Sequence, residues 1–299
     1  MDIDIYNYIR SGGAAYFEQQ RGLIAVWGKE AVPFLDGMIT NDMKTLEDGQ
    51  QMLAAFPNAQ GRLLAVVRVQ RQGERFLIET EAATREKVHQ NLFRFTYAGD
   101  FFVEDLTAQF RYFEFCGYVP PIELGEGGVR YEGGRSVGCF VGSNVAEAFL
   151  ETLAQLEIVP ISAELFETLR IENGIPLYGV DIDETTIVPE LGLDGLISYN
   201  KGCYIGQEII ARIHFRGHVA KQLTGLIISE PGAIATGSDL TSPDGKNAGR
   251  ITSATFSPKL EKHIALAYVR YEFLEEGAQL YHLGGDAMVK NLPFIAGSV

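Results

Sequence analysis

The sequence predicts an α+β fold that ends in a small all-β module. Between residues 52 and 116, runs with strand character flank one segment with helical spacing, and strands that flank a packed helix are typical of α+β domains. After residue 215 the pattern contains strand-like runs separated by turns rich in Gly and Pro. At 299 residues, the chain is longer than one hydrophobic core usually serves, so we expect two or three domains.

The elements of the first part follow from apolar runs and from turn residues. A buried strand is predicted over 22–28, and a short helix that opens at Glu30 leads to a polar loop at 40–42. In that loop Asn41 can bond nearby backbone amides or hold a polar edge of a ligand, and both alternatives stay open. An antiparallel meander and a helix follow, with boundaries at 52–57, 62–71, 75–80 and 81–95.

Two amphipathic helices are predicted in the middle of the chain, after strands at 101–106 and 109–116. The first covers 144–156 with Asn144 as its N-cap, and the second covers 162–172 with Ser162 as its N-cap. Gly174 supplies a left-handed stop for the second helix. The strands of the all-β module are expected at 222–229, 249–256 and 263–269.

Composition and charge limit the partners that the chain can have. Apolar residues make up 46% and charged residues 21% of the sequence, as in ordinary globular proteins. The net charge of −14 repels phosphate backbones and anionic lipid, so neither nucleic acid nor a membrane is an expected partner. The N-terminus lacks the basic and apolar regions of a signal peptide, and no apolar run reaches membrane-spanning length, which together predict a cytoplasmic location.

The cysteine and histidine patterns predict no metal site. The sequence has three widely spaced cysteines without a CxxC pair, which fits neither a disulfide framework nor a zinc site. His214 and His218 have a spacing of four residues, but Gly217 breaks the helix that would align them. Cys116 and Cys139 lack basic neighbours and are interpreted as structural.

Cys203 is the candidate reactive thiol. It lies between Gly202 and Gly206, just before a segment of helical spacing that begins at Gln207, and a helix N-terminus favours a thiolate. The ammonium group of Lys201 is expected to favour the thiolate further, so we predict a pKa below the free value of about 8.5. The alternative is a small buried apolar residue, which is the common role of an unpaired cysteine.

Glu190 is the candidate ligand-binding acid. Pro189 fixes the backbone just before it, and a carboxylate held rigidly can accept two parallel hydrogen bonds from an amidine-like edge such as that of a pterin. The alternative is a solvated surface acid.

Several motifs together resemble the YgfZ-type folate-binding proteins, which are relatives of the glycine cleavage T-protein, an aminomethyltransferase. The most specific match is the segment KGCYIGQE at residues 201–208, and weaker matches lie at 40–42, 61–62, 169–176 and 189–190. The resemblance covers nearly the whole chain. It implies two ferredoxin-like lobes around a central folate channel plus a C-terminal β-barrel, with domains at 1–110, 111–215 and 216–299, of which the first two can exchange segments.

The resemblance also implies a ligand and its contacts. Tetrahydrofolate or a derivative is the expected cofactor, with Glu190 holding the pterin. Arg212 and Arg216 face the negative tail of the folate, although a salt bridge from Arg212 to Glu208 is an equally good structural use. The full set of expected ligand-binding residues is Glu190, Asn41, Tyr204, Gln207, Arg212 and Arg216.

For activity, the resemblance implies folate-dependent assembly or repair of iron-sulfur clusters in other proteins, with Cys203 and Lys201 as catalytic residues and client proteins or assembly factors as partners. The T-protein has an aspartate for aminomethyl transfer where this chain has residues 61–65, with Leu64 and Ala65 at the expected place and no carboxylate. A one-carbon transferase that uses another acid is therefore the alternative, and a non-catalytic scaffold that uses folate to shape a surface is the third hypothesis.

Overall fold

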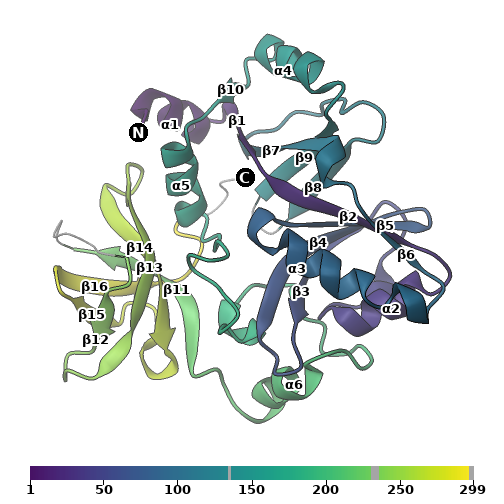
Figure 1. Cartoon of the computed structure of the whole chain (residues 1–299). Coiled ribbons are helices and arrows are strands. Elements are labelled where there is room, and N and C mark those ends of the chain that lie inside the picture. The colour runs from purple at the N-terminus through teal and green to yellow at the C-terminus, as the bar shows by residue number, and fades with distance from the viewer. Residues whose placement is uncertain (134–135, 230–235, 296–299) are drawn as a thin grey trace.

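Two five-stranded sheets and a closed six-stranded barrel form the molecule, as Figure 1 shows. The structure is a computed structural model that describes residues 1–133, 136–229 and 236–295, without the side chains of Ser136 and Arg216. The predicted α+β class with a C-terminal barrel is confirmed. Within the described ranges, every helix is too short or too polar to span a membrane.

The first sheet has the strand order β3-β4-β5-β2-β6, and each pair of neighbours is antiparallel. Its apolar face, which includes Ile24, Val67 and Ile78, packs with Leu35 of α2 and Leu92 of α3 in one core. The predicted meander is confirmed, because three consecutive strands of this sheet pair in chain order. The elements are β2 (Arg21–Trp27), α2 (Ala31–Met38), β3 (Gln51–Pro57), β4 (Leu63–Gln72), β5 (Arg75–Glu81), α3 (Ala82–Phe93) and β6 (Phe102–Asp105).

The second sheet has the order β10-β1-β7-β9-β8 and includes a strand from the N-terminal segment. That strand, β1, pairs antiparallel with β7 and parallel with β10. Only Gln20 separates β1 from β2 of the first sheet. The elements are α1 (Ile3–Arg10), β1 (Ala14–Gln19), β7 (Phe110–Gly117), β8 (Val129–Gly133), β9 (Ser136–Gly142), α4 (Ala146–Gln155) and β10 (Val159–Pro160).

The two sheets pack face to face through a shared cluster that includes Leu23 and Leu77 from the first sheet and Tyr112, Tyr131 and Phe140 from the second. Because side chains alternate along a strand, residues 65, 67 and 69 of β4 enter the core on the helix side, whereas positions 66 and 68 face the other way. This second face is the one that turns toward the middle of the molecule.

The barrel contains β11 (Lys221–Ile228), β12 (Asp239–Thr241), β13 (Asn247–Ser257), β14 (Lys262–Arg270), β15 (Gln279–His282) and β16 (Gly285–Lys290). It closes where β11 pairs antiparallel with β16. Its interior is filled by small and branched apolar side chains such as Ala265, Ala287 and Val289, which leaves it a packed core.

Helix α5 (Ala163–Glu172) joins the second sheet to the barrel. Leu165 and Leu169 pack against α1 and β1, whereas Ile171 packs against the barrel. The predicted cap is confirmed, because the Oγ of Ser162 accepts a hydrogen bond from the amide of Leu165 at 3.2 Å. Gly174 follows the helix with a φ of 66°, as its predicted stop requires.

The predicted N-cap of the preceding helix is wrong. Helix α4 begins at Ala146, and Val145 is its cap residue without any side-chain hydrogen bond. The amide of Val145 is bonded to the carbonyl of Gly142 at 3.0 Å in a turn, so Asn144 lies within that turn and one residue too early to cap the helix.

Candidate functional site

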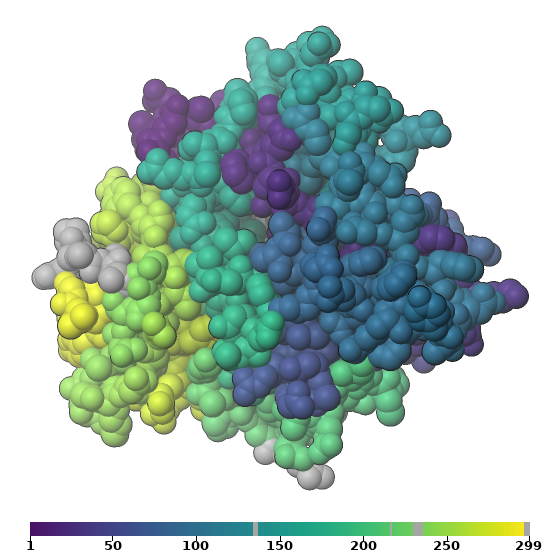
Figure 2. Space-filling view, in the orientation of Figure 1, coloured from purple at the N-terminus to yellow at the C-terminus, as the bar shows by residue number. Residues whose placement is uncertain are grey.

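A cavity of about 460 Å³ lies where the two sheets and α5 meet, and Figure 2 shows the three parts of the molecule packed around this middle region. Its apolar lining includes Leu53, Val66 and Leu193. Its polar lining includes charged side chains from six elements of both lobes, namely Arg10, Arg21, Arg68, Glu79, Glu81, Glu114 and Arg170.

One wall of the cavity is a buried ion cluster between the two sheets. Glu79 accepts a bond from the Nε of Arg68 at 2.7 Å and also pairs with Arg21. Burial opposes ionisation of Glu79, but the two guanidinium groups outweigh it and hold its pKa below the usual value. Arg68 also donates to the hydroxyl of Tyr112 at 2.6 Å, and Tyr112 donates to Glu114. Glu79 is therefore an ionised acid whose two oxygens serve the joint between the sheets.

Glu81, at the end of β5, also lines the cavity, but unlike Glu79 it has no salt-bridge partner among the described residues. Its side chain is only 8% exposed, and its Oε2 accepts a hydrogen bond from the amide of Tyr178 at 3.0 Å. Burial raises the pKa of Glu81, although Arg21 and the Tyr178 amide act in the opposite direction. The structure gives Oε1 no hydrogen-bond partner among the described residues, and this oxygen is open to the cavity.

Strand β4 carries no acid at the positions where the T-protein resemblance implied one. Ala65 lies fully buried in the core on the helix side, and Leu64 packs against the same core. The next residue, Val66, is a cavity-lining residue. The cavity side of this part of the strand is therefore apolar, and any carboxyl group there must come from β5 or β7.

Glu190 lies in the short 3₁₀ helix η4 (Val188–Leu191) and is 4% exposed. Its Oε2 accepts a hydrogen bond from the amide of Ile187 at 3.2 Å. Burial raises the pKa of Glu190, whereas that amide and the charges of Lys221 and Arg62 act to lower it. Among the described residues, Glu190 is not part of the cavity lining. Its role toward a pterin stays a prediction.

The side chain of Lys201 is fully buried against the end of α2 and the loop that follows it. Its ammonium group donates to the carbonyls of Asp36, Ile39 and Asn41 at 2.6, 2.9 and 2.6 Å. It also lies 3.1 Å from the Oδ1 of Asp36. Burial lowers the pKa of Lys201, and the Asp36 carboxylate opposes that shift. A lysine has three N–H donors, so these carbonyls use its full donor capacity, and its predicted effect on the thiol of Cys203 stays a prediction.

Cys203 is exposed, whereas Cys139 is buried and Cys116 is partly buried in the cavity wall. Burial raises the pKa of both Cys116 and Cys139 to about 12, so those two thiols stay protonated at neutral pH. The helix that follows Cys203, α6 (Gln207–Arg216), begins after Gly206, which has a φ of 82°. The alternative of a buried apolar role for Cys203 is therefore wrong.

The structure gives the polar groups of Asn41 and Arg212 partners within the chain. Asn41 donates to the carbonyls of Leu53 and Gly195, each at 2.8 Å. Arg212 forms a salt bridge with Glu208 at 2.7 Å, which is the structural use that the sequence left open. The side chain of Arg216 lies outside the described residues.

Tyr204 and Gln207 serve the local packing of the same segment. Tyr204 is 8% exposed in a core with Leu63 and Ile210, and burial raises its pKa to about 12. Gln207 donates to the carbonyl of Gly202 at 3.3 Å. Across the described part of the chain, no group of three or more His, Cys, Asp or Glu side chains is placed to hold a metal ion.

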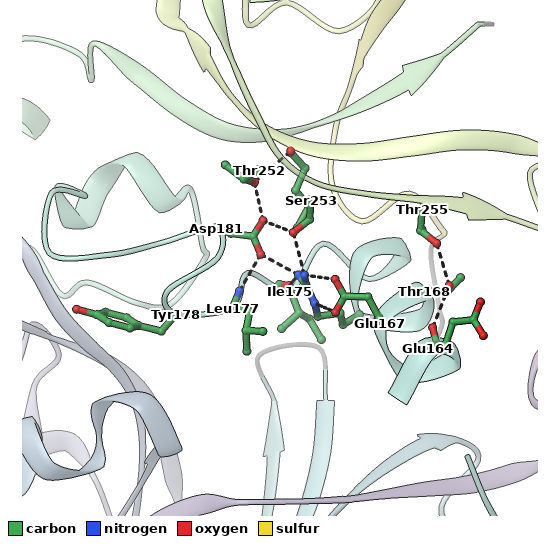
Figure 3. Close-up of polar contacts among 12 residues, drawn as sticks. Glu164, Glu167, Thr168, Ile175, Leu177, Tyr178, Asp181, Thr252, Ser253 and Thr255 are labelled. Atoms are coloured by element: carbon green, nitrogen blue, oxygen red, sulfur yellow. Dashed lines mark hydrogen bonds and ion pairs between the residues drawn. The ribbon is translucent and has the colours of Figure 1, made fainter. Parts of the chain in front are cut away.

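The sequence did not predict the buried joint between α5 and the barrel, which Figure 3 shows. Arg170 donates to Asp181 at 2.8 Å and to the Oγ of Ser253 at 2.9 Å, and that hydroxyl donates to Asp181 at 2.7 Å. Arg170 also lines the cavity. The joint thus fixes one wall of the cavity to the barrel, and no local sequence pattern could have indicated a contact between residues 170 and 253.

Comparison with known proteins shows that the chain is similar to aminomethyltransferases. Residues 221–290, which are the barrel strands from β11 to β16, match the family described as the glycine cleavage T-protein C-terminal barrel domain. The chain is 24% identical to the aminomethyltransferase of Caldanaerobacter subterraneus over 98% of this chain and 85% of that protein. It is 28% identical to the aminomethyltransferase of Rubrobacter xylanophilus over 87% of this chain and 77% of that protein.

Among solved structures, the crystal structure of the glycine cleavage system aminomethyltransferase T from Bartonella henselae matches with a TM-score of 0.85. The match covers 94% of this chain and 86% of that chain at 22% identity, and it shows that the two share a fold. The chain is thus similar to aminomethyltransferases over most of its length, and its barrel matches the T-protein barrel family. The YgfZ-type subfamily stays a prediction.

Proposed function

We propose that this chain binds a tetrahydrofolate derivative in its central cavity and takes part in folate-dependent one-carbon transfer. The observation that carries the proposal is the cavity of about 460 Å³, which lies between the two lobes and α5 of a fold shared with an aminomethyltransferase. Relatives that carry the name aminomethyltransferase align with nearly the whole chain, which favours one-carbon chemistry over other uses of the fold.

The cavity suits a flat heterocycle with a few polar edges. Ligand pockets commonly have volumes of about 300–1,000 Å³ and combine apolar walls with a small number of fixed polar groups. Here Leu53, Val66 and Leu193 supply apolar wall, and Glu81 supplies a fixed carboxyl group. The cavity therefore offers both burial and polar contacts for a pterin ring.

The remaining ligand contacts are proposed at residues that do not line the cavity itself. Glu190 has one oxygen held by the Ile187 amide, and its other oxygen can accept a hydrogen bond from the 2-amino group of a pterin. Further contacts with the folate are proposed for Asn41, in the loop after α2, and for residues in or just before α6, namely Tyr204, Gln207, Arg212 and Arg216.

Calorimetric titration with tetrahydrofolate tests the proposal. Replacing Val66 by Phe adds a ring inside the cavity, and we expect affinity to fall at least about tenfold, which is about 1.4 kcal/mol. The matched control is the same change at Val180, which is 50% exposed, and it should leave affinity unchanged. Glu190→Gln should cost a similar or larger factor if a charge-assisted bond of about 1.5–3 kcal/mol is lost.

Two results would reject the folate site. The first is an absence of measurable binding to the wild-type protein, and the second is equal affinity for wild type and Val66→Phe. If folate binds as proposed, turnover of methylenetetrahydrofolate with an amine acceptor then separates a transferase from a protein that only binds folate.

A second candidate function is maintenance of iron-sulfur clusters in other proteins, and the exposure of Cys203 favours it. A thiol must reach the surface to exchange a bond with a client protein, and the raised pKa of about 12 makes Cys116 and Cys139 unsuited to that step. Under this hypothesis Cys203→Ala binds folate normally but does not restore cluster enzymes in cells that lack the protein. Full restoration by Cys203→Ala would exclude the role of the thiol.

A further inference from the structure

Glu81 has the features of a ligand-contacting acid. Its side chain is more than nine-tenths buried, it lines the cavity, and one of its oxygens is fixed by the Tyr178 amide. The other oxygen has no partner among the described residues. That oxygen is not among the buried atoms without a partner, so it is open to the cavity, where a ligand or water can supply a hydrogen bond.

The other acids of the cavity wall are already paired. Glu79 is held by Arg21 and Arg68, and Glu114 accepts bonds from Tyr112 and from Gln19. Removing either acid from its partners would break a buried network. Glu114 accepts both of its bonds at Oε2 and lies within that network. Of the three acids that line the cavity in the described residues, Glu81 is thus the one that forms no hydrogen bond or ion pair with another side chain.

We propose that Glu81 is the proton-donating residue of the cavity, whose free oxygen contacts the bound folate at an acceptor nitrogen. This inference rests on the proposed function and extends it by naming the acid that replaces the carboxylate missing from β4. When the proton moves, the O–H bond of Glu81 breaks, an N–H bond forms on the ligand, and Glu81 is left as a carboxylate. Residues Leu64 to Val66 offer no group for this step.

Burial in the cavity wall favours a protonated carboxyl group at Glu81, although some of the neighbouring charges oppose it. Arg21 from β2 and Arg170 from α5 lower the pKa of Glu81, and Glu79 on its own strand raises it. Burial is the largest effect and raises the pKa, and a ligand that displaces the remaining water from the cavity would raise it further. Binding of a neutral ring next to Glu81 should therefore draw a proton from solvent.

Proton uptake on binding tests the inference directly. We would titrate tetrahydrofolate at neutral pH in two buffers of different ionisation enthalpy, because the difference in heat reports the protons exchanged. The wild-type protein should take up protons, and Glu81→Gln should take up none while it binds within about tenfold of wild type. Gln keeps the oxygen that accepts from Tyr178, so its fold should persist, and circular dichroism checks that.

Glu74→Gln is the matched control, because Glu74 is an exposed acid in the turn that precedes the same strand, and it should behave like wild type. In turnover of methylenetetrahydrofolate, loss of one acid–base group should slow Glu81→Gln by about 100-fold or more. The rate of the wild-type protein should fall as pH rises through the pKa of Glu81, and this dependence should vanish in the variant.

Wild-type proton uptake and wild-type turnover in Glu81→Gln would overturn the assignment of Glu81 and leave the folate site standing. No binding by the wild-type protein would instead overturn the proposed function itself. If Glu81→Gln fails to fold, Glu81→Asp provides the second test, because it keeps an ionisable group one methylene further from the ligand. Unchanged proton uptake and an unchanged pH profile in Glu81→Asp would also count against the inference.

Discussion

The cavity wall and the segment from Lys201 to Glu208 use buried polar groups in opposite ways. The ammonium group of Lys201 donates hydrogen bonds to three backbone carbonyls and lies next to the Asp36 carboxylate. Glu81 is also buried, but one of its oxygens has no partner among the described residues and is open to the cavity. The difference teaches that burial alone does not identify a functional group, because the unfilled bonding capacity is what a ligand can use.

The largest effect that this comparison predicts is on stability at Lys201. Replacing Lys201 by Met leaves the Asp36 carboxylate and the loop carbonyls without their buried partner, and breaking such a pair costs about 3–5 kcal/mol. Urea denaturation at neutral pH measures the loss. Lys44→Met is the control, because Lys44 pairs with the same carboxylate at 3.2 Å but is 62% exposed, so we expect a change of at most about 1 kcal/mol.

Equal losses from the two lysine variants would contradict the comparison, since they would mean that the enclosure of Lys201 has no energetic consequence.

An intermediate effect is predicted for Glu81 as a dependence of stability on pH. Because the folded-state pKa of Glu81 lies above its unfolded value, its contribution to stability is fully present below the unfolded pKa and is lost as pH rises through the folded pKa. Glu81→Gln cannot ionise, so it should be more stable than wild type at pH 8 and should lose this advantage on acidification. Urea denaturation at several pH values checks both points.

A stability difference between Glu81→Gln and wild type that stays constant from pH 4 to pH 8 would show that the carboxyl group does not titrate in this range.

The smallest effect on stability is expected at Cys203. Because its side chain is exposed, Cys203→Ser should change the free energy of unfolding by no more than about 0.5 kcal/mol. The same variant should remove the rapid reaction of the native protein with a thiol reagent such as dithionitrobenzoate at pH 8. Cys116 and Cys139, with pKa values of about 12, should react only after unfolding.

Rapid labelling of a second thiol in native Cys203→Ser would show that the cavity wall around Cys116 opens more readily than its packing indicates.

Local chemistry explains which features could be predicted from the sequence. Ser162 and Gly174 act on neighbouring backbone groups, so the limits of α5 follow from a few residues. The meander likewise follows from alternation and turns. Gly202 and Gly206 indicated a bend of the backbone around Cys203, whereas the exposure of its side chain was left open by the sequence.

The sequence could not predict that Glu79 and Glu81 line a cavity, because their burial depends on contacts between distant parts of the chain. On β5, Glu79 and Glu81 have the spacing of an ordinary solvated strand face, and only the packing of the second sheet and α5 turns that face into a wall. The joint of Arg170 with Ser253 likewise depends on where the barrel docks. Glu190 was singled out for its rigid backbone, and its bond to the Ile187 amide is local, but its burial depends on how the surrounding elements pack.

The strand exchange near the N-terminus sets the order in which the chain can be assembled. Strand β1 finds its partners β7 and β10 only after residues 110–117 and 159–160 exist, whereas β2, one residue further on, pairs with β5 at 75–81. On a ribosome the first sheet can therefore form while the segment before it is still unpaired. That early segment has to remain free of wrong partners until about half of the protein has emerged, which makes synthesis rate and chaperone access part of how this cavity is made.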